Sequence, residues 1–423
     1  MNRRTNRVQR TLVSILSILL VAMLVLVGLK LLDKGDNQVA NNPPTPQETQ
    51  NPDETPDENN SNETSEPSEV KKAKILANGD LLIHVTLYAS VYDETTDSFD
   101  FNSHYDEVRD FLRSGDLTIG NFEGSISNQY DYGGYPLFNT PSEIVDAIKN
   151  AGYDVISLAN NHILDSRGEG VVSTYNAFNN AGINTMGVVL SEQDRILVKD
   201  VNGIKVALLA YSYGYNGMEE TITQEQYDSM LTPLDPVRIK ADIEAAKEIS
   251  DVIVVYPHMG IEYMLEPTQE QVDLFHNMIA WGADIVFGNH PHVIQPTETV
   301  QRDGLDKFII YSMGNFISNQ RLETLDNIWT ERGVLMEVNI SKDGDNPVVI
   351  DSVIGHPTWV FKENYDPTRI AFGMVLADYK VLLTENYLDQ DHGLDEWTLE
   401  RIRTAHREVV DHLNINGFQG GQP

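Results

Sequence analysis

The chain of 423 residues contains no cysteine and is short of basic residues. Without cysteine it cannot form a disulfide framework, a thiolate zinc site, an iron–sulfur cluster or a cysteine nucleophile. Its 30 Lys and Arg residues are outnumbered by 64 Asp and Glu residues, which gives a formal net charge of −34. Proteins that bind DNA, RNA or anionic lipid over their whole surface carry the opposite balance. We therefore expect no nucleic-acid partner.

One long apolar run lies near the N-terminus, at residues 11–32, where Lys30 is the only charged side chain. A helix of this length rises roughly 33 Å, enough to cross the hydrocarbon layer of a membrane. Four arginines precede the run and acidic residues follow it, so the positive-inside rule places residues 1–10 in the cytoplasm and the rest outside the cell. A cleaved signal peptide is the alternative, but its apolar region is shorter and ends at a small-x-small site. We predict an uncleaved, single-pass anchor in the cell membrane.

Residues 33–70 contain ten acidic residues, Lys34 as the only base and no aromatic residue. Such a segment cannot bury enough apolar surface to offset the entropy lost on ordering, so we predict a disordered, self-repelling stalk. An acidic tail that collects metal or binds a partner is the alternative. Because residues 1–32 carry five bases and no acid, residues 71–423 keep a net charge of −30.

Residues 71–357 alternate apolar runs with amphipathic helical patterns, which is typical of an α/β domain. Capping residues and terminating glycines predict helices at residues 141–152, 235–246 and 268–281. The dipeptide Asn202-Gly203 predicts a type I′ hairpin. Beyond this domain we expect a C-terminal extension, whose bounds are residues 358–423 and whose predicted helix covers 395–413.

A short unit recurs along the body, with an Asp, an apolar run of strand length and then a group of polar side chains. Its copies are SGDLTIGNFEG (114–124), AGYDVISLANNH (151–162), SDVIVVYPHMG (250–260) and WGADIVFGNHPH (281–292). A fifth run, KILANGD, lacks the leading Asp and ends at Asp80. Unbroken apolar runs are typical of strands buried on both faces, so we predict a parallel sheet covered by helices.

The carboxyl ends of parallel strands meet at one edge of a sheet, where ligands bind. The repeated unit would bring to that edge Asp80, Glu123, Asn161, His162, His258, His290 and His292. Oxygen and imidazole donors without thiolate suit Mn²⁺, Fe²⁺ or Zn²⁺, bound as one ion or as a pair. Each residue alone would indicate a hydrogen-bonded structural residue or a turn, but five such groups after five strands favour a metal site.

Other histidines and one tyrosine-rich segment can be explained without a role in metal binding. The remaining histidines are expected to be structural or on the surface: His104, His276, His356, His392, His406 and His412. His84, four residues after Asp80, stays open. The tyrosine-rich segment 128–138 could form a wall of the site or be an ordinary surface excursion.

Six motifs together resemble the bacterial CapA family, which is associated with poly-γ-glutamate capsules and is similar to calcineurin-like metallophosphoesterases. They are GDLLIH (79–84), GNFEG (120–124), LANNHILD (158–165), PHMGIEY (257–263), GNHPHVIQPTE (288–298) and YSMGNF (311–316). The resemblance covers residues 75–357. It implies an α/β fold with a layered sheet core of the calcineurin-like metallophosphoesterase type and helices outside, preceded here by one transmembrane helix. The anchor and stalk resemble those of membrane-bound members on Gram-positive surfaces.

The resemblance also implies roles for individual residues. The first metal ion would be bound by Asp80 and His292, the second by Asn161, His258 and His290, with Glu123 as the bridge. His162 would be the general acid, oriented by Asp165. Substrate contacts would come from Asn121, Asn160, Glu262, Ser312 and Asn315. Two departures from the superfamily are the missing D-x-H opening and the Glu, rather than Asp, at position 123.

Such a site would activate water for attack on a phosphoester or on a γ-glutamyl amide, while a histidine protonates the leaving group. The first hypothesis is an extracellular, membrane-anchored hydrolase of poly-γ-glutamate capsule biosynthesis or export, with capsule-synthase membrane subunits as partners. The second is a non-catalytic accessory subunit that binds the polymer through the same metal ions. A phosphatase of surface lipid or wall phosphate is the third. The acidic body favours transient handling of a polyanion at metal ions over its storage along the surface.

Overall fold

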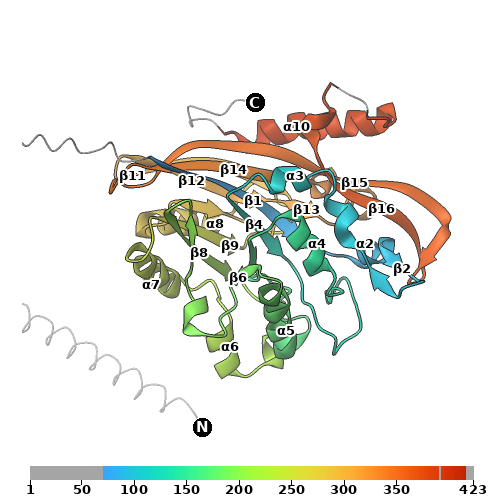
Figure 1. The fold of residues 1–423 in the computed structure, drawn as a ribbon, viewed down its shortest axis with the longest axis horizontal. Coiled ribbons are helices and arrows are strands. Elements are labelled where there is room, and N and C mark those ends of the chain that lie inside the picture. Colours follow the sequence, from blue (N-terminus) through green and yellow to red (C-terminus); the bar gives the residue numbers. More distant parts are fainter. Residues whose placement is uncertain (1–69, 390–391, 416–423) are drawn as a thin grey trace, which may run out of the picture. The chain divides into compact units, whose positions relative to one another are not determined.

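Two β-sheets that face each other form the centre of the molecule in the computed structural model (Figure 1). The structure describes residues 70–389 and 392–415. The predicted cytoplasmic segment and anchor, and the predicted stalk up to residue 69, lie outside these residues. Within the described part of the chain, no helix combines the length and the hydropathy that a membrane span requires.

The first sheet contains eight strands. They are β1 (Lys71–Leu81), β4 (Leu117–Phe122), β5 (Val155–Ser157), β6 (Asn184–Met186), β13 (Asn315–Ile317), β14 (Arg332–Lys342), β15 (Val349–Ala371) and β16 (Met374–Leu383). Their order is β16-β15-β14-β1-β4-β5-β6, and β13 pairs with the end of β1. The neighbours β1, β4, β5 and β6 are parallel, whereas β14, β15 and β16 extend the sheet in antiparallel fashion.

The second sheet contains six strands. They are β7 (Leu197–Val201), β8 (Ile204–Ser212), β9 (Val252–His258), β10 (Ile285–Phe287), β11 (Ile294–Arg302) and β12 (Leu305–Met313). Their order is β11-β12-β10-β9-β8-β7, with parallel central strands and an antiparallel strand at each edge.

Helices cover the outer faces of both sheets. The first sheet packs against α2 (Val85–Ser90), α3 (Arg109–Leu112), α4 (Ile144–Ala151) and α5 (Arg167–Asn180). The second packs against α7 (Pro236–Lys247) and α8 (Gln269–Trp281). The other elements are β2 (Tyr92–Asp93), β3 (Ser98–Phe99), α6 (Gln224–Met230), α9 (Leu322–Leu325), α10 (Glu396–Leu413) and the 3₁₀ turns 101–105, 192–194, 218–221, 328–331 and 384–387. The expected α/β fold, with a layered sheet core and helices outside, is confirmed.

The expectation of a single parallel sheet is wrong in one respect, because the five ligand-bearing strands belong to two sheets. β1, β4 and β5 lie in the first sheet, and β9 and β10 lie in the second. Side chains such as Ile119, Val254 and Ile310 meet between the sheets. Each strand is therefore buried by helices on one face and by the opposite sheet on the other, and both burial patterns give the same unbroken apolar run.

The leading Asp of each repeated unit fixes the register of two neighbouring parallel strands. Its backbone N–H donates to a carbonyl in the next strand, and its Oδ2 accepts the N–H of that same residue at 2.8 or 2.9 Å. The pairs are Asp116 with Lys74, Asp154 with Thr118, Asp251 with Lys205 and Asp284 with Ile253. We call these four pairs the aspartate clamps. Because they align the strand starts, they also align the strand ends that carry the polar groups.

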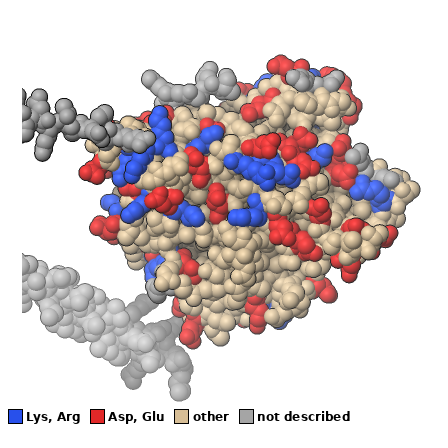
Figure 2. Space-filling model, viewed as in Figure 1, with Lys and Arg blue, Asp and Glu red and all other residues tan. Residues whose placement is uncertain are grey.

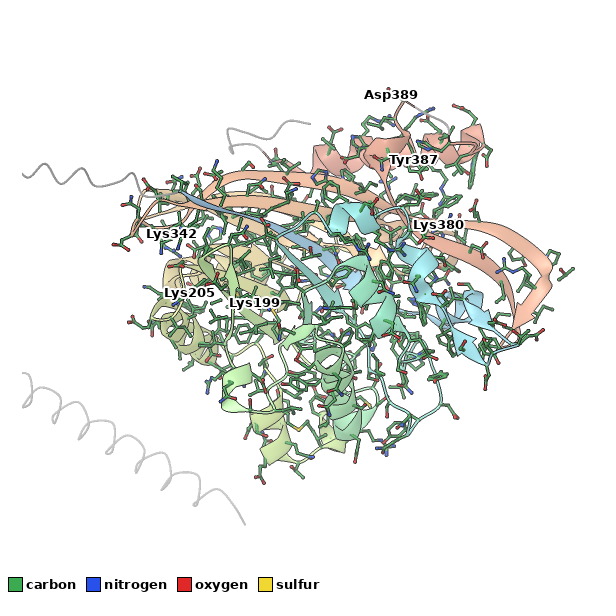
Figure 3. All side chains as sticks on the ribbon, in the orientation of Figure 1. Lys199, Lys205, Lys342, Lys380, Tyr387 and Asp389 are labelled. Carbon is green, nitrogen blue, oxygen red and sulfur yellow. The ribbon has the colours of Figure 1, made fainter. Side chains whose placement is uncertain are left out.

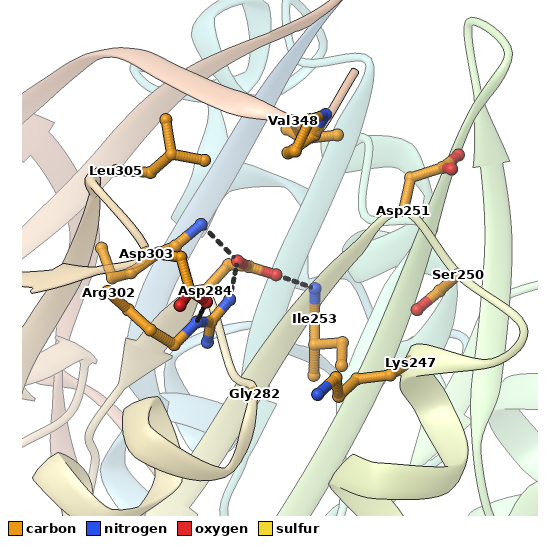
Figure 4. Close-up of a pocket in the computed structure, with 12 residues that line it drawn as sticks. Lys247, Ser250, Asp251, Ile253, Gly282, Asp284, Arg302, Asp303, Leu305 and Val348 are labelled. Carbon is orange, nitrogen blue, oxygen red and sulfur yellow. Dashed lines mark hydrogen bonds and ion pairs between the residues drawn. The ribbon is translucent and has the colours of Figure 1, made fainter. Parts of the chain in front are cut away.

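Two of the clamps make further ion pairs. Asp284 lines a cavity of about 420 Å³ at the start of β9 and β10 (Figure 4), and it also pairs with Arg302 at 2.8 Å and with Lys307 at 2.6 Å. Asp251 pairs at 2.5 Å with Lys342 of β14, which is labelled in Figure 3 beside the hairpin of β7 and β8. This second pair joins the two sheets at the edge where the strands begin.

The predicted turns and helices follow their local signals. Asn202 and Gly203 have φ values of 54° and 82° and connect β7 to β8 in a two-residue turn, which confirms the predicted hairpin. The side chains of Asp235 and Thr268 cap α7 and α8. Gly152, in the left-handed region at φ 107°, ends α4.

The sheet continues beyond the expected domain end at residue 357. β15 runs through Pro357, and β16 pairs with its second half. The helix α10 begins after Asp395, whose carboxylate accepts the N–H of Thr398 at 3.0 Å. Tyr387, labelled in Figure 3, joins the apolar cluster that holds α10 against β15 and β16.

Candidate metal centre

The carboxyl ends of strands from both sheets bring most of the expected ligands into one buried group. Asp80 ends β1, Glu123 follows β4, and Asn161 lies in the loop after β5. His258 ends β9, and a backbone bridge joins it to Asn289, next to His290. Six side chains are between 0% and 3% exposed: Asp80, Glu123, Asn161, His258, His290 and His292. The edge predicted from the sequence therefore exists, although two sheets form it.

The first donor group consists of Asp80, Glu123 and His292. One ligand atom from each lies within 4.8 Å of the others. The Nδ1 atom of His292 is 3.1 Å from Asp80 Oδ2 and 3.1 Å from Asn315 Oδ1. Because two oxygens face Nδ1, this nitrogen carries a proton, and Nε2 is the atom available to a metal ion.

The second donor group consists of Glu123, His258 and His290, again with ligand atoms within 4.8 Å of one another. His258 Nε2 lies 2.8 Å from Asn161 Oδ1 and 3.6 Å from Glu123 Oε1. Asn161 therefore adds an amide oxygen to this group. Glu123 belongs to both groups and could therefore contribute a carboxylate oxygen to an ion in either of them.

Unpartnered atoms show that these residues fit a divalent metal. Both carboxylate oxygens of Glu123 and the Nδ1 atom of His290 are buried without a hydrogen-bond partner among the described residues. A buried carboxylate without hydrogen bonds is costly unless a cation accompanies it. Carboxylate, imidazole and amide donors without thiolate are the set that Mn²⁺, Fe²⁺ or Zn²⁺ accepts.

The charges in the group compensate one another. Burial alone would raise the pKa of Glu123, but His292 and His258 outweigh burial and lower this pKa below its usual value. Burial acts to lower the pKa of His292, yet Glu123 and Asp80 raise it to about 9. Burial holds the pKa of His290 well below its usual value. Without metal, the Glu123 carboxylate therefore lies beside an imidazolium, whose Nε2 proton a bound ion would displace.

His162 lies beside the two donor groups and is held by Asp165. His162 Nδ1 is 2.7 Å from Asp165 Oδ2, and the same oxygen accepts the backbone N–H of Phe138 at 2.6 Å. The Phe138 ring packs edge-on against His162 with centroids 4.7 Å apart, and against His84 at 5.2 Å. The segment 128–138 therefore forms a wall of the site through Phe138. This arrangement directs the Nδ1 side of His162 toward Asp165 and turns Nε2 to the opposite side of the ring.

Four of the five expected substrate contacts are buried and support other residues. Asn121 Nδ2 donates to Asp80 Oδ1 at 2.8 Å. Asn160 donates to the carbonyl of Phe122 and accepts the N–H of His162. Ser312 accepts the N–H of Gly314, and Asn315 contacts His292 with its oxygen and donates to the carbonyl of Thr330 with its amide nitrogen. The fifth, Glu262, is exposed.

Asn216, which was not among the residues predicted from the sequence, connects two site residues. It lies in the loop after β8 with φ at 54°. Its Oδ1 accepts from Asn161 Nδ2 at 3.3 Å, which turns the Asn161 oxygen toward His258, and its Nδ2 is 3.5 Å from His162 Nε2, the ring nitrogen that Asp165 does not hold. The only signal in the sequence is Asn216-Gly217, which indicates a turn and no chemistry.

Tyrosine rings also border the histidines. The Tyr213 ring lies 4.5 Å from that of His290, and the Tyr263 ring lies 6.2 Å from that of His292. His84 is largely enclosed, and burial lowers its pKa to about 4. Its Nδ1 accepts the N–H of Asn319 at 3.3 Å. The histidine that the sequence left open is therefore neutral and part of the wall.

Comparisons with known proteins identify the family of this chain. The family model described as bacterial capsule synthesis protein PGA_cap matches residues 74–320, which include all the ligands named above. A capsule biosynthesis protein CapA from Bacillus anthracis is 33% identical over 224 residues, covering 50% of this chain and 53% of that protein. A PGA biosynthesis protein CapA from Bacillus subtilis is 28% identical over 260 residues, covering 60% and 65%. Each alignment thus spans less than two thirds of the relative.

Among solved structures, the calcineurin-like phosphoesterase YfkN from Bacillus subtilis aligns with a TM-score of 0.38 and 13% identity, covering 81% of this chain and 99% of that one. The family match extends over more than half of the present chain, from β1 to the segment after β13. The chain belongs to the bacterial capsule synthesis protein PGA_cap family.

Proposed function

We propose that this chain is a metal-dependent hydrolase that acts outside the cell, anchored in the membrane, during synthesis or export of a poly-γ-glutamate capsule. The observation that carries the proposal is Glu123, a buried carboxylate that two donor groups share and that has no hydrogen-bond partner within residues 70–389 and 392–415. Structural histidines and carboxylates in a core have hydrogen-bond partners. The capsule role is supported by membership in the family and by the names of the two Bacillus relatives.

Each ligand would hold an ion from a fixed direction. Asp80 and His292 would hold the first ion, Asn161, His258 and His290 the second, and Glu123 both. Bound divalent ions would supply an activated water and positive charge for the oxygens of the substrate. Asn121 keeps Asp80 in place through its hydrogen bond at 2.8 Å.

The protein's own proton donor in this scheme is His162. Asp165 holds its Nδ1–H, so that a proton on Nε2 can pass to the leaving group. The leaving group would be an alcohol from a phosphoester or an amine from a γ-glutamyl amide. Phe138 restricts the ring of His162 by edge-on packing, which keeps Nε2 in one direction.

The charge of the body supports transient contact with an anionic substrate. Figure 2 shows acidic and basic side chains interspersed on one face, without a continuous basic groove. A polyanion would therefore be attracted locally, at the metal ions, and repelled elsewhere over distances up to about 8–10 Å.

A non-catalytic role in polymer binding or export is the second candidate. It is favoured by the burial of all six candidate ligands. Hydrolysis would require the main chain of a long polymer to enter a buried centre, whereas binding would require only a single carboxylate group to do so. In that case the ions would bind carboxylate groups of the polymer without turnover.

The decisive experiment compares His162→Ala with His276→Ala, a partly exposed histidine paired with Glu298. The full chain would be purified, loaded with Mn²⁺ and assayed against a phosphodiester and against poly-γ-glutamate. We expect His162→Ala to keep its metal content and lose at least 100-fold in turnover, and His276→Ala to resemble the wild type. Equal turnover by both variants would reject hydrolysis at this site. Recovery of the chain in the membrane fraction, with the body sensitive to added protease on intact cells, would test the anchoring and orientation.

A further inference from the structure

The loop after β9 carries an exposed acid next to the metal centre. This loop, residues 259–267, connects the ligand His258 to α8. Two backbone hydrogen bonds join it to the turn that carries the other histidines, from Met259 N–H to the Asn289 carbonyl at 3.0 Å and from Tyr263 N–H to the Pro291 carbonyl at 2.8 Å. Glu262 precedes Tyr263 and is exposed. Its backbone position is therefore fixed relative to His290 and His292.

Glu262 lies within reach of both histidines. One carboxylate oxygen of Glu262 and one ring nitrogen each of His290 and His292 lie within 4.8 Å of one another. His290 Nδ1 is buried and has no hydrogen-bond partner among the described residues. Glu262 also acts on His292 as a neighbouring negative charge. The geometry is thus that of a third donor group, which shares one histidine with each of the first two.

We propose that Glu262 is a further metal ligand, which reaches the two-ion centre from its solvent side. The inference rests on the proposed function, because it needs the centre to bind metal. Glu123 approaches the same histidines from the buried side, where it is 1% exposed. The two carboxylates would therefore enclose the ions between them, one permanently buried and one open to solvent.

The difference in burial gives the two carboxylates different roles. Glu123 cannot leave the centre without repacking the core. Glu262 can exchange, because water is available to its carboxylate when it leaves an ion. An incoming phosphate or carboxylate group has the same donor chemistry and would replace it. Glu262 would thus stabilise the ions between substrates and give up its position to an anionic oxygen of the substrate.

Direct metal binding tests this role without an activity assay. Glu262→Gln would be compared with Glu266→Gln, an exposed neighbour on the same loop, in the full-length chain. Mn²⁺ alone would be titrated by calorimetry, and bound metal would be counted after gel filtration. We expect the wild type and Glu266→Gln to behave alike, and Glu262→Gln to bind at least one ion 10-fold or more weakly. The melting temperature of the metal-free protein should be the same in all three, because both side chains are exposed.

Two outcomes would overturn the inference, and they differ. If Glu262→Gln binds Mn²⁺ with wild-type stoichiometry and affinity, Glu262 is not a ligand, while the two-ion centre stands. If the wild type binds no Mn²⁺, the centre itself fails, and with it both the proposed function and this inference.

Discussion

Replacing the shared carboxylate, Glu123→Gln, should separate metal binding from folding. Glu123 is 1% exposed and has no hydrogen bond among the described residues, and its Oε1 lies 3.6 Å from His258 Nε2 and 3.8 Å from His292 Nε2. The glutamine has nearly the same volume but no charge. Both donor groups therefore lose one of three ionisable ligands, while the packing of the core stays the same.

The size of the effect follows from linkage. An ion present at 100 times its dissociation constant stabilises the folded state by about 2.7 kcal/mol. In a folded body of this size that corresponds to roughly 3 to 5 °C in melting temperature. We expect the wild type to show at least this shift when Mn²⁺ is added and Glu123→Gln to show less than about 1 °C on the same scale.

Differential scanning fluorimetry with and without Mn²⁺ provides the measurement. Glu225→Gln, on the exposed side of α6, is the matched control and should keep the full shift. A full Mn²⁺-dependent shift in Glu123→Gln would refute the assignment of Glu123 as the bridge. Loss of the shift in Glu225→Gln would show that any removal of acidic charge has this effect.

Three further predictions concern other parts of the molecule. Asp154→Ala should lower the free energy of unfolding by about 1–3 kcal/mol, because the buried N–H of Thr118 loses its acceptor; urea denaturation would show this, and Asp154→Asn should recover most of the loss. His356 has a pKa raised to about 9, because its two glutamate partners outweigh burial; its contribution to stability is complete below about pH 6.5 and should be lost as the pH rises through 9, whereas His356→Gln should show no such slope in pH-dependent melting. Asn216→Ala should weaken Mn²⁺ binding about 10-fold by releasing Asn161, as calorimetry would show; unchanged affinity would contradict the positioning role.

The ligand positions were predictable because strand length and strand direction are visible in the sequence. From Asp116 to Glu123, and from Asp154 to Asn161, the distance is seven residues. In the structure the first residue of each pair is a clamp at the strand start, and the second is a candidate ligand that follows the strand. The clamp itself was not predicted, because an Asp before an apolar run is also a common turn residue.

The division into two sheets was not predictable from the same pattern. A strand that faces helices on one side and another sheet on the other has the same apolar run as a strand between two layers of helices. The roles of Asn160 and Asn315 were equally hidden. Their amides are used in hydrogen bonds to backbone groups, and a sequence shows that an amide is present but not which of its atoms are free.

The geometry of the loops also limited how much of the site could be predicted from the sequence. His290 and His292 have φ values of 102° and 59°, so both depart from the backbone that a strand or helix would impose. Asn216 and Glu262 come from loops whose paths depend on such turns. Residue types alone indicate donors in these loops, but their direction comes from the tertiary structure.

The aspartate clamps have a consequence for how the family can change in sequence. An aspartate clamp fixes the start of each strand, and a candidate ligand lies at or just beyond its end. The number of residues between them therefore sets the position of the ligand, because each residue advances a strand by about 3.3 Å and turns the side chain to the opposite face. A one-residue insertion within β9, between Asp251 and His258, would move the imidazole off the centre even if the fold survived. Insertions in the connections between a helix and the next strand, before the clamp aspartate, would leave every candidate ligand in place. Chain length is therefore constrained within the strands and free in the connections, and related sequences should vary in length accordingly.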